Sequence, residues 1–428
     1  MLSEGGEVLL TASIIFVLIY ALIVSEKIHR TIAALFGAVI MILFSFIPQE
    51  KAIEAIDFNT LGLLIGMMVI VEITKHTGLF EYLAVKAAKW SKGEPMKIML
   101  ALSLITAVAS AFLDNVTTVL LIVPVTFSIT RTLGVKAFPF LMAQIFASNI
   151  GGTATLIGDP PNIMIGGAAG LSFLDFVIND APAVIVVQAV TSLIFYLLYR
   201  KQVVVEPENR KKILAMDEME FIKDTKLLRK SLAVLGLTIL GFILHGALHL
   251  EAATLAMAGA TLLLAVSGLE PEKVFRGVEW PVIFFFVGLF ILVGTLEELG
   301  VIKLIAVKAV ELTKGNLVLT GLLILWLSAI ASAFIDNIPF VATMIPLIKS
   351  MGAIGGMDIM PLWWALSLGA CLGGNGTLVG ASANVVVAGM AEERGEPISF
   401  TRYLAVGFPI MLVSIIISTV YLYIFYLT

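Results

Sequence analysis

One stretch of ten residues occurs twice in this chain, and both copies place an aspartate and an asparagine inside an apolar segment. The first copy is ASAFLDNVTT at residues 109–118, and the second is ASAFIDNIPF at residues 331–340. Asp336 therefore lies 222 residues after Asp114. An ionisable residue is costly to bury in such a setting and is a candidate functional residue. Two of them in matching contexts predict a two-fold site.

The sequence around these copies repeats with the same offset of 222 residues. Residues 57–93 correspond to residues 279–315, with glycines opposite glycines and lysines opposite lysines at several positions. We therefore expect a duplication, with one half at residues 1–199 and the other at residues 231–428. Between the halves lies an expected cytoplasmic linker at residues 200–230, which holds nine of the chain's lysine and arginine residues.

The composition predicts a membrane protein. Hydrophobic residues make up 59% of the chain and charged residues 14%, with a mean hydropathy of +1.04, whereas soluble domains are about 25% charged. The apolar runs are close to the ~20 residues that cross a bilayer as a helix, and they lack the alternation of a β-barrel. We expect an all-α, multi-pass protein embedded in the lipid bilayer of a plasma or inner membrane.

Charge and cysteine content narrow the partners. A net charge of −4 without a basic stripe argues against a nucleic-acid partner. The single cysteine, Cys371, excludes an internal disulfide and argues against a cysteine-rich metal site.

The two Asp-Asn segments are expected to be re-entrant hairpins, at residues 97–131 and 317–350, which enter and leave the membrane on one side. Each half then crosses the bilayer five times, and an odd number of crossings inverts the second half relative to the first. With both termini outside, all but five of the 27 lysine and arginine residues fall on the inner side, as the positive-inside rule favours. The five outer ones are Lys51, Lys303, Lys308, Lys314 and Lys349.

Each hairpin is followed by a helix that glycines interrupt, at residues 137–168 and 361–391, and the first break also contains two prolines. Glycine costs about 1 kcal/mol and proline about 3 kcal/mol in a helix interior, so unwinding is expected. Unwound backbone at membrane depth is tolerated where it lines a cavity, and transporters with inverted repeats bind substrate at such breaks. The alternative for the glycines is close helix packing. Because the pattern Gly-Gly-x-x-Thr-x-x-Gly occurs in both halves, we favour a site between them.

The candidate ion- or substrate-binding residues lie on these four elements. They are Asp114, Asn115, Thr117, Thr118, Asn149, Gly152, Thr153, Thr155, Gly158, Asp159, Asn162, Asp336, Asn337, Gly374, Asn375, Thr377, Gly380, Ser382 and Asn384. When ionised, Asp114 and Asp336 could hold Na⁺ together with Asn115 and Asn337, because a hard cation prefers oxygen ligands. When protonated, the two aspartates could carry H⁺. Helix capping is a third role, and it is compatible with ion binding.

Asp159 differs from the other candidates, because Ala381 stands at the equivalent position of the second half. It either makes a symmetric site asymmetric or forms a turn before two prolines. The sequence leaves both roles open.

Other classes of function find less support. No histidine lies in the duplicated motifs, so an enzyme's catalytic pair is not evident. The phosphate-binding motif Gly-x-x-x-x-Gly-Lys-Ser/Thr does not occur, so energy must come from an ion gradient or from a separate ATPase partner. Apart from a bound Na⁺, no cofactor is expected.

Four motifs together resemble the ion transporter superfamily. They lie at residues 112–118, 149–162, 334–340 and 373–384. The resemblance covers nearly the whole chain and is strongest to the arsenite permease and sodium/proton antiporter (ArsB/NhaD) branch, with the melanosomal P protein and its prokaryotic relatives. It implies a homodimer in which a fixed scaffold domain supports a transport domain that moves across the membrane as an elevator.

More distantly, the chain is similar to dicarboxylate/sodium symporters, whose hairpin tips carry Ser-Asn-Thr. Here the tips read Asp-Asn-Val at residues 114–116 and Asp-Asn-Ile at residues 336–338. The additional carboxylate at each tip repels a dicarboxylate and disfavours that substrate. The leading hypothesis is a secondary active transporter of a small inorganic or organic anion, arsenite-permease-like, coupled to H⁺ or Na⁺. The alternatives are a Na⁺/H⁺ antiporter and a passive anion channel, for example for chloride, in the same fold.

Overall fold

The computed structural model describes residues 4–25 and 27–428 of the chain. Residues 1–3 and 26, which belong to the expected first half, lie outside the described residues. Over the described ranges the regular secondary structure is helical, without a β-strand. Nine of the helices found there are long and apolar enough to cross a bilayer. The expected all-α polytopic fold is confirmed.

The helices of the first half follow the apolar runs and their interruptions. They are α1 (Glu4–Ser25), α2 (Arg30–Leu43), α3 (Gln49–Glu54), α4 (Phe58–Lys75), α5 (Leu79–Trp90), α6 (Pro95–Ser110), α7 (Asn115–Leu133), α8 (Phe138–Thr153), α9 (Pro160–Ala169), α10 (Phe173–Asn179) and α11 (Ala181–Tyr199).

The linker contains two short elements, α12 (Pro207–Leu214) and the 3-10 helix η1 (Glu218–Phe221). The helices of the second half are α13 (Thr225–Leu248), α14 (Ala252–Ser267), α15 (Pro271–Arg276), α16 (Trp280–Glu298), α17 (Val301–Thr313), α18 (Leu317–Phe334), α19 (Asn337–Gly355), α20 (Met360–Gly373), α21 (Ser382–Glu393) and α22 (Phe400–Phe425).

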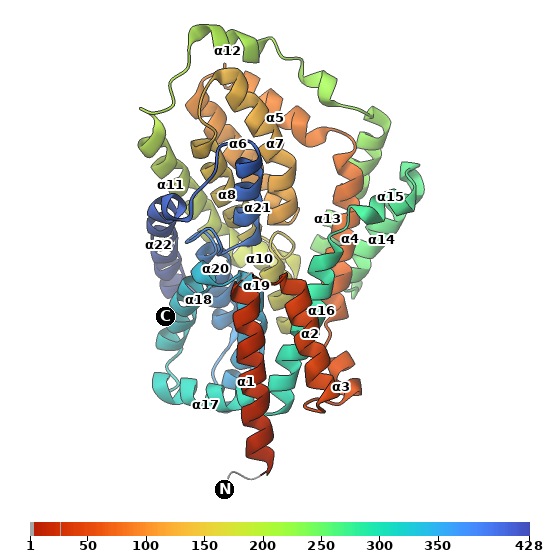
Figure 1. The fold of residues 1–428 in the computed structure, drawn as a ribbon, viewed down its shortest axis with the longest axis vertical. Coiled ribbons are helices and arrows are strands. Elements are labelled where there is room, and N and C mark those ends of the chain that lie inside the picture. The colour runs from red at the N-terminus through yellow and green to blue at the C-terminus, as the bar shows by residue number, and fades with distance from the viewer. Residues whose placement is uncertain (1–3, 26) are drawn as a thin grey trace.

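Each Asp-Asn segment joins two helices, α6 to α7 and α18 to α19. Asp114 caps α7 because its carboxylate accepts the backbone N–H of Thr117 at 2.9 Å, and Asp336 caps α19 by accepting that of Ile338 at 3.1 Å. Figure 1 shows α6 and α7 in the upper part of the molecule and α18 in the lower part, with α5 and α17 towards opposite ends. The side of the membrane from which each hairpin enters stays a prediction.

Two helix pairs that the 222-residue offset relates pack through the same small residues. A Cβ added to Gly66 of α4 would lie 2.6 Å from the carbonyl carbon of Ala256 on α14. A Cβ added to Gly288 of α16 would lie equally close, 2.6 Å, to the carbonyl carbon of Ala34 on α2. Small residues allow two helices to approach closely in a membrane. Equivalent contacts therefore recur in the two halves.

The hairpins pack mainly on the interrupted helices, α6 on α8 and α18 on α20. A Cβ added to Gly151 of α8 would lie 2.6 Å from Ala107 Cα, and one added to Gly373 of α20 would lie 2.6 Å from Ala329 Cα. The helices thus form two groups. One group contains the hairpins and the interrupted helices, and the other contains the pairs α2 with α16 and α4 with α14.

The start of α13 and the lengths of three helices bear on the expected domains. The linker ends at Asp224 rather than at residue 230, because the Asp224 carboxylate accepts the backbone N–H groups of Lys226 and Leu227 and so starts α13. The helices α2, α14 and α20 have 14, 16 and 14 residues, fewer than the ~20 of a full span. The count of five crossings in each half therefore stays a prediction.

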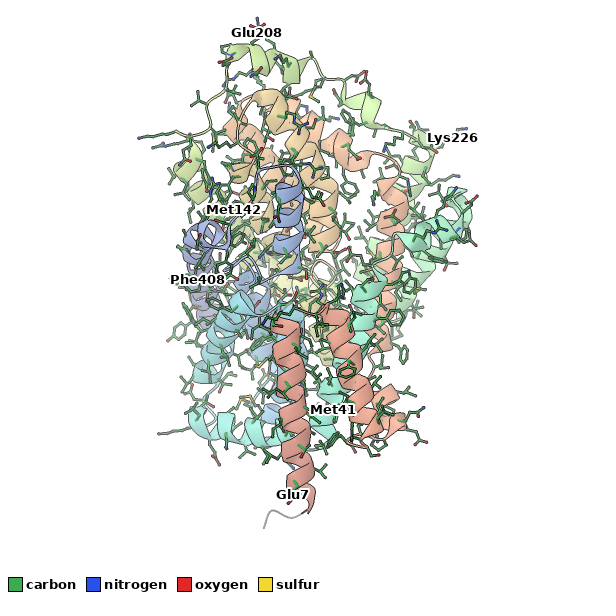
Figure 2. All side chains as sticks on the ribbon, viewed as in Figure 1. Glu7, Met41, Met142, Glu208, Lys226 and Phe408 are labelled. Atoms are coloured by element: carbon green, nitrogen blue, oxygen red, sulfur yellow. The ribbon has the colours of Figure 1, made fainter. Side chains whose placement is uncertain are left out.

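The surface fits a lipid environment. Large apolar side chains such as Val17 and Ile185 are more than half exposed, as they can be where lipid tails are the solvent. The charged residues labelled in Figure 2 lie towards the two ends of the molecule, with Glu208 and Lys226 in the upper part and Glu7 at the lower end.

Candidate functional site

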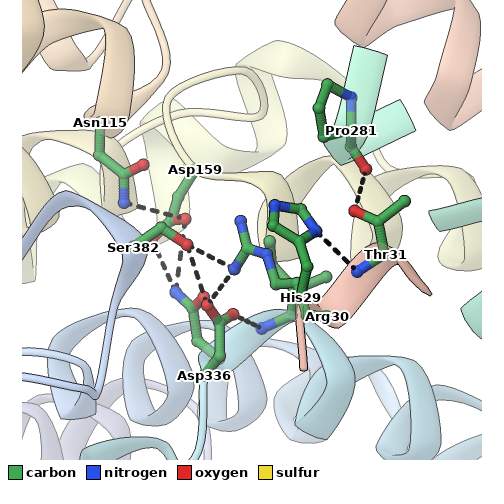
Figure 3. Close-up of polar contacts among 10 residues, drawn as sticks. His29, Arg30, Thr31, Asn115, Asp159, Pro281, Asp336 and Ser382 are labelled. Atoms are coloured by element: carbon green, nitrogen blue, oxygen red, sulfur yellow. Dashed lines mark hydrogen bonds and ion pairs between the residues drawn. The ribbon is translucent and has the colours of Figure 1, made fainter. Parts of the chain in front are cut away.

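The starts of α2 and α16 are held together, which brings a cation and an acid to the centre of the molecule. His29 caps α2 by accepting the backbone N–H of Thr31, whose hydroxyl donates to the carbonyl oxygen of Pro281 at 2.7 Å. Arg30, the first residue of α2, and Glu279, which directly precedes α16, line one cavity together with residues of both hairpin tips. Figure 3 shows the contacts around Arg30.

Arg30 binds the tip of the second hairpin. Its Nη1 lies 2.6 Å from Asp336 Oδ2 in an ion pair and donates to Ser382 Oγ at 2.7 Å. Ser382 in turn donates to Asp336 Oδ2 at 2.9 Å. The guanidinium lies over the ring of Phe285, 5.2 Å from its centroid, in a cation–π contact. Arg30 therefore connects the α2 and α16 pair to a hairpin and an interrupted helix.

Asp114 faces the same cavity from the first hairpin, where its carboxylate accepts both the hydroxyl and the backbone N–H of Thr117. The cavity is about 20 Å³, roughly the space that one water molecule needs. Its polar lining combines acids, amides, a hydroxyl and a guanidinium: Arg30, Asp114, Asn115, Asp159, Glu279, Asn337 and Ser382.

Asp159 joins the two hairpin tips. Its side chain is buried, and Oδ1 accepts from Asn115 Nδ2 at 3.3 Å and from Asn337 Nδ2 at 3.4 Å. Asn337 Nδ2 also lies 3.3 Å from Oδ2. Asp159 thus lies between equivalent asparagines of the two halves, at a position where the second half offers only the methyl group of Ala381.

Asparagine side chains behind Asp159 connect the interrupted helices. Asn149 Oδ1 accepts from Asn115 Nδ2 at 3.1 Å. Asn149 Nδ2 donates to Asn375 Oδ1 at 3.0 Å and to Asn384 Oδ1 at 2.9 Å. All of these amides are buried. The amide network therefore ties α8 to the loop after α20, through Asn375, and to the first turn of α21, through Asn384.

The candidate glycines and threonines shape the unwound loops and do not line the cavity. A Cβ at Gly152 would lie 2.5 Å from the carbonyl oxygen of Gly158, and one at Gly374 would lie 3.0 Å from that of Gly380. Threonine hydroxyls donate to backbone carbonyl groups, Thr153 to Asn149, Thr155 to Ala111 and Thr377 to Ala333. The hydroxyl of Thr118 is buried and has no hydrogen-bond partner among the described residues. Close packing accounts for these glycines, and their expected place at the ion stays a prediction.

The expected sodium site requires oxygen atoms of two aspartates and two asparagines to face one point. Asp336 Oδ2 is bound by Arg30, and the amide nitrogens of Asn115 and Asn337 face Asp159. In the described part of the chain, no three His, Cys, Asp or Glu side chains are grouped so that they could hold a metal ion. The contacts therefore do not fit a sodium ion shared by the four residues in this conformation.

Arg30 and Glu279 are not among the residues that the sequence singles out. Both stand at the ends of apolar runs, where a charge is ordinary, and Arg30 fits the positive-inside rule as a loop residue. The equivalent of Glu279 is Asp57, but the equivalent of Arg30 is Ala252. Arg30 and Asp159 are both charged residues whose equivalent position in the other half holds an alanine. This difference between the halves is the sequence signal that could have identified Arg30.

Comparison with known families decides the class of protein. A sequence model of the family described as "Citrate transporter" matches residues 20–369, which is most of the chain. The chain belongs to the citrate transporter family. The expected resemblance to the ion transporter superfamily and to the P protein is confirmed by this match and by the relatives below.

Two relatives of this citrate transporter family member match over nearly its whole length. An uncharacterised transporter of Mycobacterium tuberculosis (strain CDC 1551 / Oshkosh) is 46% identical, with 96% of this chain and 97% of the relative covered. The human P protein is 36% identical, with 94% of this chain and 58% of the P protein covered.

Two solved transporters share the fold of this family member. The YdaH transporter of Alcanivorax borkumensis matches with a TM-score of 0.61 and 14% identity, covering 87% of each chain. MtrF of Neisseria gonorrhoeae matches with a TM-score of 0.62 and 13% identity, covering 90% of this chain and 84% of its own. At these identities the likeness concerns the fold. Family and fold together identify a multi-pass secondary transporter of the membrane.

Proposed function

We propose that this protein moves a small anion by a proton-coupled, secondary active mechanism. The observation that carries the proposal is the cluster of acids around one guanidinium. Asp114, Asp159 and Glu279 line the cavity that Arg30 also lines, and Asp336 is paired with Arg30 beside it. If all four acids were ionised, their charge would exceed what Arg30 balances, and like charges shielded from water disfavour one another. Loading of the site therefore includes proton uptake by this cluster.

Protonation also favours binding of an anion. Once the acids are neutral, the Arg30 guanidinium and the amide N–H groups of Asn115 and Asn337 are available as donors, and a guanidinium suits planar oxyanions. Citrate, which the family description names, would bring three carboxylates towards acids at both tips. A small inorganic oxyanion or a small organic anion meets less repulsion, so we place it first and citrate second.

The contact between Arg30 and Asp336 also favours an elevator. Arg30 belongs to the group of α2 and α16, whereas Asp336 belongs to the group of hairpins and interrupted helices. If the second group moves as one body against a fixed, dimeric scaffold, this ion pair must break in every cycle. Proton uptake by the neighbouring acids that line the cavity would change the charge around this pair. Proton binding would thereby be linked to the movement, in a homodimer as the family resemblance implies.

Two other functions of the same fold remain as outcomes of the test. A Na⁺/H⁺ antiporter would need the amides of Asn115 and Asn337 to turn their oxygens towards the cation. A passive anion channel would need a continuous open path, whereas the central cavity has room for about one water molecule.

Transport by the full-length protein in liposomes tests the proposal. Uptake of labelled arsenite, phosphate, chloride and citrate would be measured with inward H⁺ and Na⁺ gradients imposed separately. We expect an H⁺ gradient to accumulate a small anion above its equilibrium level and a Na⁺ gradient at constant pH to leave uptake unchanged. Flux that is conductive and indifferent to both gradients identifies a channel, and Na⁺-driven proton movement without an anion identifies an antiporter. Either result overturns the proposal.

A further inference from the structure

A carboxyl group outside the central cavity is buried with few partners. Asp180 lies between α10 and α11, is fully buried, and does not cap α11 with its side chain. Its Oδ2 lies 2.5 Å from the hydroxyl oxygen of Ser367 on α20. Its Oδ1 has no hydrogen-bond partner among residues 4–25 and 27–428. A fully buried, ionised carboxylate with one hydrogen-bond donor is strongly unfavourable.

Ser367 has one proton to donate, and Asn162 determines where that proton goes. The Ser367 oxygen also lies 2.7 Å from Asn162 Oδ1. Asn162 Nδ2 donates to the carbonyl oxygens of Thr153 and Thr155 in the unwound loop, at 3.1 and 3.0 Å. These two bonds orient the amide so that its oxygen, which can only accept, faces Ser367.

The short contact between Asp180 and Ser367 therefore needs a hydrogen from Asp180. If Ser367 donated to an ionised Asp180 instead, two acceptor oxygens of Ser367 and Asn162 would face each other at 2.7 Å without a hydrogen between them. With a protonated Asp180, every contact has a donor: Asp180 donates to Ser367, and Ser367 donates to Asn162.

We propose that Asp180 is a proton-binding site of this protein, separate from the central acids and connected to them through Ser367 and Asn162. With the proton bound, the chain of hydrogen bonds supports the unwound loop that ends in Asp159. When the proton leaves, Ser367 turns its hydrogen to the carboxylate, and Asn162 keeps the weak thiol donor of Cys371, whose Sγ lies 3.5 Å away. Occupancy of Asp180 by a proton thus stabilises the position of Asp159 between the hairpin tips.

The titratable groups that face Asp180 come from two neighbouring elements. Cys371 lies on α20, and Tyr421 and Tyr426 lie on α22 and just after it. The tyrosine hydroxyls donate to the backbone oxygen and to Oδ1 of Asn179, the residue before Asp180, at 2.7 and 2.6 Å. None of the ion pairs in the described chain involves Asp180. The carboxyl group is therefore surrounded by neutral partners, which suits its protonated form.

The second half lacks this arrangement, although it contains the same unwound loop. Asn384 stands in the place of Asn162, and its Oδ1 accepts from Asn149 Nδ2 at 2.9 Å. The amide of Asn149 does not gain or lose a proton, so this hydrogen bond does not depend on pH. Arg402 stands in the place of Asp180. Because the second loop is supported without an acid, the acid in the first half is not a general requirement of the fold.

Infrared difference spectroscopy of the full-length protein in lipid nanodiscs tests the protonation of Asp180. The wild type should show the carbonyl band of a protonated carboxylic acid at neutral pH, and Asp180→Asn should lose one component of it. The matched control is Asp175→Asn, because Asp175 on α10 accepts the backbone N–H of Ser172 at 2.7 Å and is an acceptor. This control should keep the band. A band that is identical in the wild type and Asp180→Asn overturns the proposal.

A second variant decides the question if Asp180→Asn does not fold. Ser367→Ala removes the acceptor of the Asp180 proton, so the band should persist and shift to higher frequency. An unshifted band contradicts the chain of hydrogen bonds.

The connection between Asp180 and transport rests on the proposed proton-coupled transport. The proposal for Asp180 and the proposal for coupling can be disproved by different results. In liposomes, Asp180→Asn should shift the pH of half-maximal uptake relative to the wild type and to Asp175→Asn. If wild-type uptake ignores pH gradients, the proposed coupling fails while the infrared band still decides Asp180. If uptake is proton-driven and Asp180→Asn keeps the wild-type pH profile, Asp180 is not connected to the cavity.

Discussion

The sequence identifies Asp336 as a candidate site residue but does not identify Arg30, the residue that forms an ion pair with it. Asp336 stands out in the sequence because an acid inside an apolar run is unusual and because Asp114 repeats it. Arg30 does not stand out, because an arginine at the end of an apolar run is ordinary. The two residues are 306 positions apart, and no local pattern joins them. The tips of the site could therefore be predicted, but their cation could not.

Replacing Arg30 by glutamine should destabilise the centre of the molecule. Asp336 would lose its ion pair while it stays largely shielded from water, which costs on the order of 1–3 kcal/mol for a partly buried pair. We expect a lower melting temperature in detergent and a loss of at least about tenfold in transport, which corresponds to 1.4 kcal/mol. The measurements are thermal unfolding and initial uptake rate.

The matched control for Arg30→Gln is Lys51→Gln, which breaks the ion pair between Lys51 and Glu54. The side chains of these two residues are 51% and 65% exposed. Exposed pairs contribute little to stability, so this variant should resemble the wild type. The double variant Arg30→Gln/Asp336→Asn should recover part of the lost stability, because no unpaired charge remains. Equal melting temperatures for Arg30→Gln and Lys51→Gln would show that the central pair is unimportant.

At the scale of elements, glycines and prolines in the sequence predict where a helix is interrupted. They do not predict which function the interrupted segment has. The interruptions at residues 154–159 and 374–381 follow from the helix propensities of the glycines and prolines in and beside them. The role of the glycines depends on distances between helices, which the sequence does not contain. The same applies to Asp180, whose place before the apolar helix α11 suggests an ordinary helix start until Ser367 and Asn162 are seen beside it.

Gly151→Ala and Gly373→Ala should each destabilise the packing between a hairpin and an interrupted helix. A new methyl group would lie 2.6 Å from Ala107 Cα in the first case and from Ala329 Cα in the second. Overpacking of this kind costs about 1–3 kcal/mol. Thermal unfolding of the purified variants measures it.

The matched control for these glycines is Gly236→Ala in α13, where an added Cβ would meet no described atom within 4 Å. Alanine exceeds glycine in helix propensity by about 1 kcal/mol, so this variant should be at least as stable as the wild type. If all three variants have the same melting temperature, close packing does not explain why glycine stands at the equivalent positions 151 and 373 of the two halves.

The contact of the linker with the first half should depend on pH. The hydrogen bond from the Lys89 ammonium holds the pKa of Glu218 below its ordinary value. A lowered pKa means that the contact is formed at neutral pH and is lost as the pH falls through the lowered pKa. We expect pepsin to cut the linker faster at a pH below that value. Glu218→Gln should be cut at the faster rate already at higher pH, and a rate that does not differ from the wild type would contradict this attachment.

At the scale of the whole molecule, the all-α fold class could be read from composition, and the repeated motif predicts a duplication. The arrangement of the two helix groups could not, because it depends on contacts such as Gly66 with Ala256, whose residues look like ordinary parts of apolar runs. The central cavity combines both kinds of information. Its aspartates come from motifs, whereas its guanidinium and Glu279 come from the packing of α2 against α16.

The central claim is that the acid cluster takes up protons together with the cargo. The most direct test records anion uptake and internal acidification at the same time in liposomes that contain the full-length protein. We expect acidification in proportion to uptake, and loss of both in Asp159→Asn. The exposed Asp358, whose carboxylate accepts the backbone N–H of Met360 at 2.9 Å, lies outside the cavity, so Asp358→Asn should keep the wild-type ratio. Anion uptake without acidification, or wild-type uptake and acidification in Asp159→Asn, would contradict proton coupling at this site.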